Sequence, residues 1–271
     1  MSTSTRSPCP PLVSRVTKGI VVAALLGLGS ACSAISPADS SADNAIGPSQ
    51  KIVAADISLL ERLRATEGLS NEPKRLAKSG IEHLLEKRLA EASKSFNTAL
   101  QLSPSNSYLQ LLNGLAYHLM ASAGDSDKYN LAEQGYLLAI KFDGSNWLAR
   151  YYLGNLRLDR RQYKEAQTAF AEALLYVDSD KEMLYQLAAA SYYAGDPSTA
   201  VGALQRLEAI EPSQPKVQRA LAVVMAALGR ADEADLYLKS YRTTQSDPRA
   251  TNRLADRLRG WRRFHQNAGI A

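Results

Sequence analysis

The fold is decided by residues 151–180, which read YYLGNLRLDRRQYKEAQTAFAEALLYVDSD. In this stretch a small residue, Gly154, is followed twelve positions later by a second one, Ala166. A large apolar side chain, Phe170, comes four positions after that, and Ala173 a further three. Two antiparallel helices approach closely only where both present small side chains, and a large neighbour fills the space beside the crossing. The stretch therefore predicts one helical hairpin.

The same spacing recurs in five units along the chain. The paired small residues are Gly80 and Ala92, Gly114 and Ala132, Gly154 and Ala166, Ala188 and Ala200, and Ala222 and Ala234. The second pair alone carries six extra residues, and each pair is followed twelve positions on by a helix breaker (Pro104, Gly144, Asp178, Pro212, Ser246). From the third unit the period is 34 residues, which is typical of stacked helical hairpins. A single hairpin cannot bury its own apolar face, so the units should stack into a solenoid.

This register resembles the tetratricopeptide repeat family over about residues 73–246. The resemblance implies an all-α, right-handed superhelical solenoid of about five hairpins, with a capping helix at each end. The repeats would span residues 73–106, 107–146 with the insertion, 147–180, 181–214 and 215–246. Arg157 and Arg160 depart from the pattern, because they stand where the family usually has an aromatic residue and a leucine.

Two local signals refine the helix boundaries. Gly195 should end one helix, Asp196 should cap the next, and Pro197 should occupy its first turn. The insertion at Ala121–Lys128 is polar and made of small residues. We expect it to form a surface loop that lengthens one hairpin tip, since loop tips tolerate insertions.

Residues 1–31 read as a secretory signal that is removed from the mature protein. A positively charged start is followed by an apolar run, Gly19–Leu28, which is too short to span a membrane comfortably. Small residues then lead directly to Cys32, an arrangement that resembles the lipobox of bacterial lipoproteins. The resemblance implies that Cys32 is diacylated, and Ser33 after it favours the outer membrane. Ordinary signal cleavage without acylation is the alternative.

The two ends of the mature chain should differ in structure. Residues 32–50 hold the acylated cysteine and a tether poor in large apolar residues, which should be flexible. Residues 51–72 contain an amphipathic N-terminal helix. Residues 247–271 predict a basic amphipathic helix with four apolar residues at helical spacing, namely Leu254, Leu258, Trp261 and Phe264. We expect this helix to cap the solenoid; the alternative is a basic surface for anionic lipid or an acidic partner.

Charge and motifs exclude several classes of function. The formal net charge is +5, but three of the positive charges belong to the signal, and the remaining basicity is concentrated after Lys239. The chain therefore lacks the long basic face that binding of nucleic acid would require. The sequence contains no HExxH motif, paired cysteines, phosphate-binding loop or GxSxG elbow. We therefore expect no catalytic residues, cofactor, metal or small-molecule substrate.

The family resemblance also implies where a partner would bind, because the first helix of each hairpin lines the inner groove. The corresponding residues are Tyr108, Leu111, Leu115 and His118 in the second unit, Leu148, Tyr151, Asn155 and Leu158 in the third, and Tyr185, Ala189, Tyr192 and Tyr193 in the fourth. They suggest an aromatic and aliphatic groove for an extended or helical apolar segment. A clamp for a terminal carboxylate is disfavoured, because only Asn155 is of the required type. Alternatively, these side chains pack between hairpins, or the N-terminal helix fills the groove.

A lipid-anchored cysteine, a short tether and about five repeats resemble the lipoproteins of the Tad (Flp) pilus and the pilotins of type IV pili. The resemblance implies a non-enzymatic scaffold at the outer membrane, facing the periplasm, which binds a protein during pilus or secretion-system assembly. A secretin subunit is the partner implied. The alternatives are a scaffold for envelope enzymes, such as peptidoglycan synthases or proteases, and a structural subunit of the machinery that inserts outer-membrane barrels.

Overall fold

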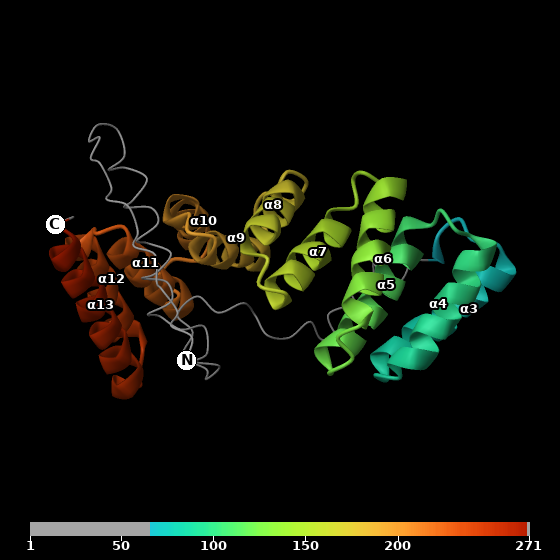
Figure 1. Cartoon of the computed structure of the whole chain (residues 1–271), viewed down its shortest axis with the longest axis horizontal. Helices are drawn as coiled ribbons and strands as arrows, with labels where there is room; N and C mark the ends of the chain where they lie inside the picture. The colour runs from blue at the N-terminus through green and yellow to red at the C-terminus, as the bar shows by residue number, and fades with distance from the viewer. Residues whose placement is uncertain (1–65, 270–271) are drawn as a thin grey trace, which may run out of the picture. The chain divides into compact units, whose positions relative to one another are not determined.

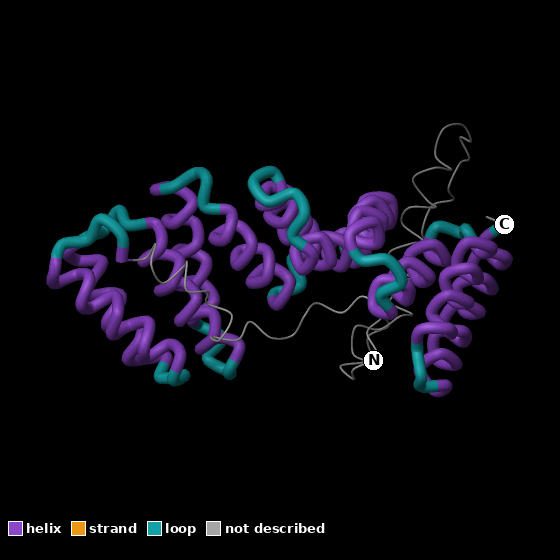
Figure 2. Tube along the Cα trace, turned by 180° about the vertical axis from the view of Figure 1, so that it is seen from behind, coloured by secondary structure: helices purple, strands orange, loops and turns teal. Residues whose placement is uncertain are grey.

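The computed structural model describes residues 66–269, and within that range all regular structure is helical (Figures 1 and 2). The predicted signal, Cys32, the tether and most of the N-terminal helix lie outside the described residues. Eleven helices lie wholly within the range: α3 (Asn71–Leu85), α4 (Leu89–Leu102), α5 (Ser107–Ser122), α6 (Lys128–Phe142), α7 (Trp147–Asp159), α8 (Tyr163–Leu174), α9 (Lys181–Tyr193), α10 (Pro197–Ile210), α11 (Pro215–Ala227), α12 (Ala231–Thr244) and α13 (Pro248–Ala268).

These helices form five consecutive hairpins, from α3–α4 to α11–α12, and α13 follows the last one. The most extensive contacts join the two helices of a hairpin, and the next most extensive join each hairpin to its successor. This is the superhelical solenoid of helix pairs that the 34-residue register predicts. No helix among residues 66–269 is long and apolar enough to cross a lipid bilayer.

The close helix crossings occur at the predicted small residues. A Cβ atom added at Gly154 would lie 2.7 Å from the Phe170 ring, and one added at Gly80 would lie 2.6 Å from Phe96. The second hairpin is tighter still, because a Cβ at Gly135 would meet the Gly114 backbone at 2.8 Å. At Gly80 and Gly154 the aromatic ring that follows the crossing is therefore packed directly against the glycine backbone, without room for a methyl group.

The turn before α10 is built as the sequence predicts. Gly195 has a left-handed backbone with φ +80°, Asp196 is the N-cap, and Pro197 lies in the first turn. The Asp196 carboxylate accepts a hydrogen bond from the Thr199 backbone N–H at 3.1 Å and another from the Thr199 hydroxyl at 2.6 Å. The equivalent residue one period earlier, Arg161, is also left-handed, with φ +58°. The turn geometry is thus retained even where glycine is absent.

The six inserted residues are divided between helix and loop, so the prediction of a purely surface loop was wrong in part. Helix α5 has 16 residues against 13 in α9, and α6 has 15 against 14 in α10. Only residues 123–127 connect α5 to α6. Ala121 lies in the helix and is buried, because the extra turn of α5 continues to pack on its neighbours.

The last helix covers the end of the array. Helix α13 packs against both α11 and α12, and it buries Leu254, Leu258 and Trp261, whereas Phe264 is only half buried. Its arginines point to the exposed side, where Arg262 pairs with Asp235 of α12 at 2.7 Å. The amphipathic helix thus caps the apolar end of the fifth hairpin with a polar outer face.

Gly154→Ala should destabilise the protein, because the new methyl group would sit 2.7 Å from Phe170. Overpacking of this kind costs about 1–3 kcal/mol, which exceeds the gain in helix propensity of about 0.5–1 kcal/mol. The free energy of unfolding by urea measures the effect. Gly202→Ala is the matched control, since Gly202 lies within α10 and nothing approaches its missing Cβ within 4 Å. The control substitution should leave the free energy of unfolding unchanged or raise it slightly. An equal decrease in both variants would contradict the close packing of Gly154 against Phe170.

Candidate protein-binding surface

The first helices of successive hairpins lie next to one another. Helices α3 and α5, α5 and α7, and α7 and α9 are in contact, in addition to the contacts within each hairpin. Adjacent first helices define the inner side of the array, and the second helices lie on the outer side. The inner side is therefore formed by first helices, among them α5, α7 and α9, on which the predicted groove residues lie, and α11.

The predicted groove residues differ sharply in exposure. Three tyrosines are partly exposed: Tyr108, Tyr151 and Tyr193. The others are buried, namely Leu111, Leu115, His118, Leu148, Asn155, Leu158, Tyr185, Ala189 and Tyr192. A side chain without exposed surface can shape a groove but cannot touch a partner unless its neighbours move. The groove assignment stays a prediction, and within it the partly exposed tyrosines are the ones placed for direct contact.

His118 is used inside the fold. Its side chain has 0% exposure, its Nδ1 lies 3.2 Å from the Tyr136 hydroxyl, and its Nε2 lies 3.0 Å from the Asp159 carboxylate. Tyr136 belongs to α6 and Asp159 to the end of α7. The imidazole therefore links the second hairpin to the third. Sequence reasoning placed His118 in the groove because the register identifies the helix face but not the partner that a side chain reaches.

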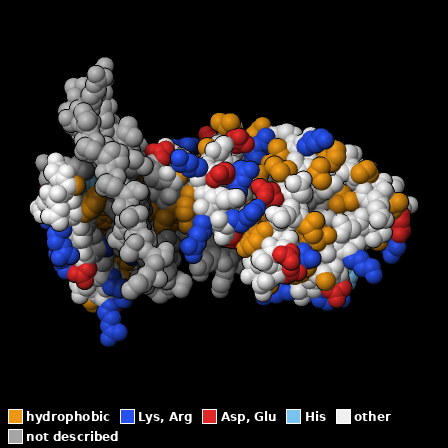
Figure 3. Space-filling view, in the orientation of Figure 1, with side chains coloured by type: hydrophobic (Ala, Val, Ile, Leu, Met, Phe, Trp, Pro, Cys, Tyr) orange, Lys and Arg blue, Asp and Glu red, His pale blue; other side chains and the backbone are white. Residues whose placement is uncertain are grey.

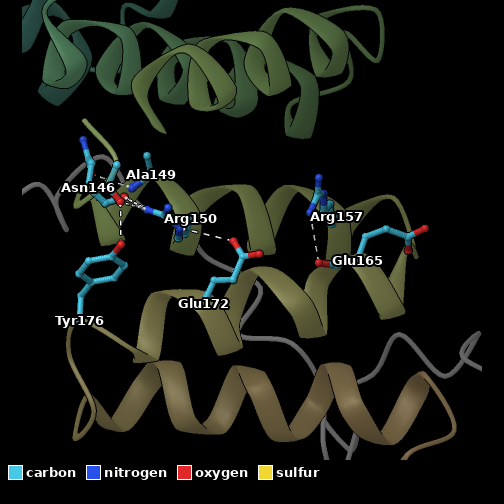
Figure 4. Close-up of polar contacts among 8 residues, drawn as sticks. Asn146, Ala149, Arg150, Arg157, Glu165, Glu172 and Tyr176 are labelled. Atoms are coloured by element: carbon cyan, nitrogen blue, oxygen red, sulfur yellow. Dashed lines mark hydrogen bonds and ion pairs between the residues drawn. The ribbon is translucent and has the colours of Figure 1, made fainter. Parts of the chain in front are cut away.

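Arginines in α7 and at its C-cap also have partners within the array, and Figure 4 shows those of Arg150 and Arg157. Arg150 donates to the Gly144 carbonyl oxygen at 2.7 Å, its guanidinium carbon lies 5.2 Å from the centre of the Tyr176 ring, and the Tyr176 hydroxyl donates to the same carbonyl at 2.9 Å. Arg160, one of the two departures from the family pattern, pairs with Glu133 of α6 at 2.9 Å. These arginines strengthen the junction of the second and third hairpins and do not form a basic surface.

A cluster on α9 and α11 was missed by sequence reasoning. We define the α9–α11 cluster as Glu182, Tyr185, Lys216 and Arg219. The Lys216 ammonium lies 3.6 Å from the centre of the Tyr185 ring and 3.8 Å from the Glu182 carboxylate. Arg219 hydrogen-bonds to the Tyr185 side chain. The signal was available, because Lys216 and Arg219 stand one 34-residue period after Glu182 and Tyr185.

The α9–α11 cluster changes the chemistry expected of the inner side. Side chains one period apart lie side by side on adjacent first helices, so Glu182 meets Lys216 and Tyr185 meets Arg219. Lys216 and Glu182 each expose more than two fifths of their side chains. The ion pair itself contributes little to stability at that exposure. The pair instead offers a partner one positive and one negative charge beside the aromatic ring of Tyr185.

Charge is distributed without one dominant sign over the face drawn in Figure 3. Basic and acidic side chains are interspersed there along the hairpins that the structure describes. Among residues 66–269, no group of three or more histidine, cysteine or carboxylate side chains is arranged to hold a metal ion. The described surface therefore supports recognition by shape, aromatic contact and individual ion pairs.

Comparison with known proteins shows the class of fold. A solved structure of MamA from Desulfovibrio magneticus RS-1 is 18% identical, covers 65% of this chain and 95% of its own, and has a TM-score of 0.56. A solved structure of pilF from Pseudomonas aeruginosa is 17% identical, covers 77% of this chain and 88% of its own, and has a TM-score of 0.54. No protein-family model and no curated protein matches the sequence.

Identities this low establish the fold alone. MamA and PilF are tetratricopeptide repeat proteins, and the present chain has the same architecture of consecutive packed helix pairs. It is a helical-repeat array of stacked hairpins. Its resemblance to the pilus lipoproteins, which the sequence suggested, extends to the fold of PilF.

Tyr185→Phe should weaken the alkaline dependence of stability. Burial raises the pKa of Tyr185 to about 12 from a usual value of 10, although Arg219 acts in the opposite direction. The folded protein thus keeps a proton that the unfolded chain releases, so this stability is complete below pH 10 and is lost as the pH rises from 10 to about 12. The shift corresponds to about 2–3 kcal/mol.

Urea unfolding at a series of pH values from 8 to 11.5 tests this prediction. The free energy of unfolding of the wild type should fall more steeply above pH 10 than that of the variant. Parallel curves for the two proteins would show that the Tyr185 phenol has the same pKa in the folded and the unfolded chain.

Proposed function

We propose that this protein is a lipid-anchored scaffold of the outer membrane that faces the periplasm and binds a secretin subunit during assembly of a pilus or secretion system. The observation that carries the proposal is the likeness to P. aeruginosa PilF, which extends over 77% of this chain and 88% of that one. The signal-like segment ending at Cys32 supports the anchor. The proposed role is binding and not catalysis, because a helical-repeat array offers extended surfaces for protein contacts.

The inner side between α7 and α11 is the contact surface that we propose for the partner. Tyr151 on α7 and Tyr193 on α9 offer partly exposed rings, and Glu182 on α9 and Lys216 on α11 offer one charge of each sign. Tyrosine contributes a large apolar area with a polar tip at a low cost in entropy. An extended or helical segment with apolar residues at intervals and a few charges between them matches this surface.

Cys32→Ala should release the protein from the membrane, because the acylated thiol is the proposed anchor and several acyl chains give firm attachment. Fractionation of cells that express the variant, followed by immunoblotting, measures the effect. The wild type should sediment with the outer membrane and the variant should be soluble in the periplasm. A variant that still sediments with the outer membrane would contradict lipid anchoring at Cys32.

Site-specific photocrosslinking in cells tests the partner and the surface together. A benzoylphenylalanine residue in place of Lys216, on the inner side, should give an adduct with a secretin subunit, identified by mass spectrometry. The same substitution at Leu236 is the control, because Leu236 is 66% exposed and lies on α12, a second helix. It should give no such adduct.

The identity of the adduct distinguishes the candidate functions. Cell-wall synthases or proteases attached at position 216 would replace the secretin proposal by a scaffold for envelope enzymes. Subunits of the barrel-insertion machinery would replace it by a structural role in that complex. Equal yields of the same adduct from positions 216 and 236 would show that the inner side is not the specific surface.

A further inference from the structure

Helix α13 continues the inner side of the array beyond the fifth hairpin. It packs against both α11 and α12, as α5, α7 and α9 pack against the two helices before them, and Figure 1 shows the three helices together. Its burial also follows the 34-residue register. The buried Leu258 stands one period after the buried Val224, and the buried Leu254 one period after the buried Ala220. Helix α13 therefore occupies the place of a first helix in a sixth unit.

The inner side changes from uncharged to basic along the array. We define its inner positions as the four places in each first helix that correspond to Leu148, Tyr151, Asn155 and Leu158. These positions hold no lysine, arginine or carboxylate on α5 and α7, one carboxylate on α9, and two basic side chains each on α11 and α13. The charged residues are Glu182, Lys216, Arg219, Arg253 and Arg257.

The four basic side chains on α11 and α13 are accessible from solvent. Lys216 exposes 42% of its side chain and Arg253 exposes 50%. Arg219 and Arg257 are half buried. Arg219 and Arg253 stand one period apart, which is the spacing that places Lys216 beside Glu182. We define the basic end of the inner side as Lys216, Arg219, Arg253 and Arg257.

Two carboxylates of the array lie beside the basic end. Glu182 lies 3.8 Å from the Lys216 ammonium, and Asp247 lies 3.8 Å from the Arg253 guanidinium. Both pairs are long and well exposed, so each contributes little. Asp247 is also the N-cap of α13 and accepts hydrogen bonds from two backbone N–H groups of its first turn. The four cations together carry more charge than these two carboxylates can offset.

Carboxylate is the chemistry that the basic end would recognise in a protein. Three of its four side chains are arginines, whose planar guanidinium binds a carboxylate through two parallel hydrogen bonds. The basic end also adjoins an aromatic contact, because the Lys216 ammonium lies 3.6 Å from the centre of the Tyr185 ring. The apolar side of α13 is buried against α11 and α12, so it cannot enter a bilayer as the apolar side of a membrane-surface helix does. A protein segment therefore matches this surface better than a lipid surface does.

We propose that the basic end binds a cluster of glutamate or aspartate side chains in a partner segment whose apolar part lies on α7 and α9. This inference rests on the proposed function, because it assumes that the inner side holds a protein segment. It adds the charge pattern of that segment, in which apolar residues are followed by acidic ones. The carboxylates are those of side chains, and a free chain end is not required.

Fluorescence anisotropy with two synthetic peptides tests the charge of the segment. The first peptide has a central block of glutamates between two apolar blocks, so either chain direction places an apolar block on α7 and α9. The second has glutamine in place of each glutamate, and both are acetylated and amidated. The full-length protein should bind the glutamate peptide about tenfold more tightly at low ionic strength. This preference should shrink as the salt concentration rises.

A matched pair of double variants tests the location. Arg253→Gln with Arg257→Gln should weaken binding of the glutamate peptide about fivefold and leave binding of the glutamine peptide unchanged. Arg259→Gln with Arg263→Gln is the control, because these exposed arginines have the same spacing on the same helix and lie outside the inner positions. Both variants lose two positive charges, so an effect of net charge alone would be equal in the two.

A single substitution on α11 tests the basic end without altering α13. Lys216→Gln should also weaken binding of the glutamate peptide, and the exposed position makes a loss of folding unexpected. Circular dichroism of all variants checks the helical content. Full binding of the glutamate peptide to both Lys216→Gln and the Arg253 and Arg257 variant would overturn the inference.

The remaining outcomes separate this inference from the proposed function. Equal affinity for the two peptides, or equal losses in the two double variants, would reject the acidic segment. Binding of phosphatidylglycerol vesicles that requires Arg253 and Arg257 and that the glutamate peptide cannot displace would assign the basic end to a lipid surface instead. A secretin adduct at position 216 together with equal peptide affinities would reject only the acidic segment. Preference for the glutamate peptide without a secretin adduct would support the basic end and reject the secretin as the partner.

Discussion

The close crossing of two helices at a pair of small residues is the constraint on which the rest of this structure depends. At Gly154 the opposing Phe170 ring occupies the volume that a single methyl group would need. This fixes how the hairpin closes and therefore which face of each helix is left for the next unit. Because the crossing recurs with the sequence period, one local packing rule generates the entire array. The inner side exists as a surface only because five hairpins obey that rule in succession.

The character of the inner side changes along the array while its geometry stays the same. At the second and third hairpins the corresponding positions hold Tyr108, which is partly exposed, and Leu148, which is buried. At the fourth and fifth hairpins, Glu182 and Lys216 face each other with much of their side chains exposed. A partner segment lying along this side would meet apolar and aromatic contacts first and paired charges later. Such a gradient gives the surface a direction, which favours one orientation of the bound segment over the reverse.

Most of the fold could be predicted from the sequence, because backbone requirements are local and repeat. Gly195, Asp196 and Pro197 specify their turn without reference to distant residues. The inserted residues could not be divided between α5, α6 and the loop in this way, since burial of Ala121 depends on packing after folding. The candidate site was less predictable for the same reason. The register assigns a helix face, but long side chains such as His118 and Lys216 choose their partners across hairpins.

The link from His118 to Asp159 has a mechanical consequence. Between hairpins, the main contacts join immediate neighbours along the chain. Small changes of angle at successive junctions therefore add up along the array. A buried imidazole that bridges two hairpins stiffens one joint, together with the ion pair of Arg160 and Glu133. The angle between the second and third hairpins should therefore vary little. When a partner binds, changes in the curvature of the array would come from the other junctions.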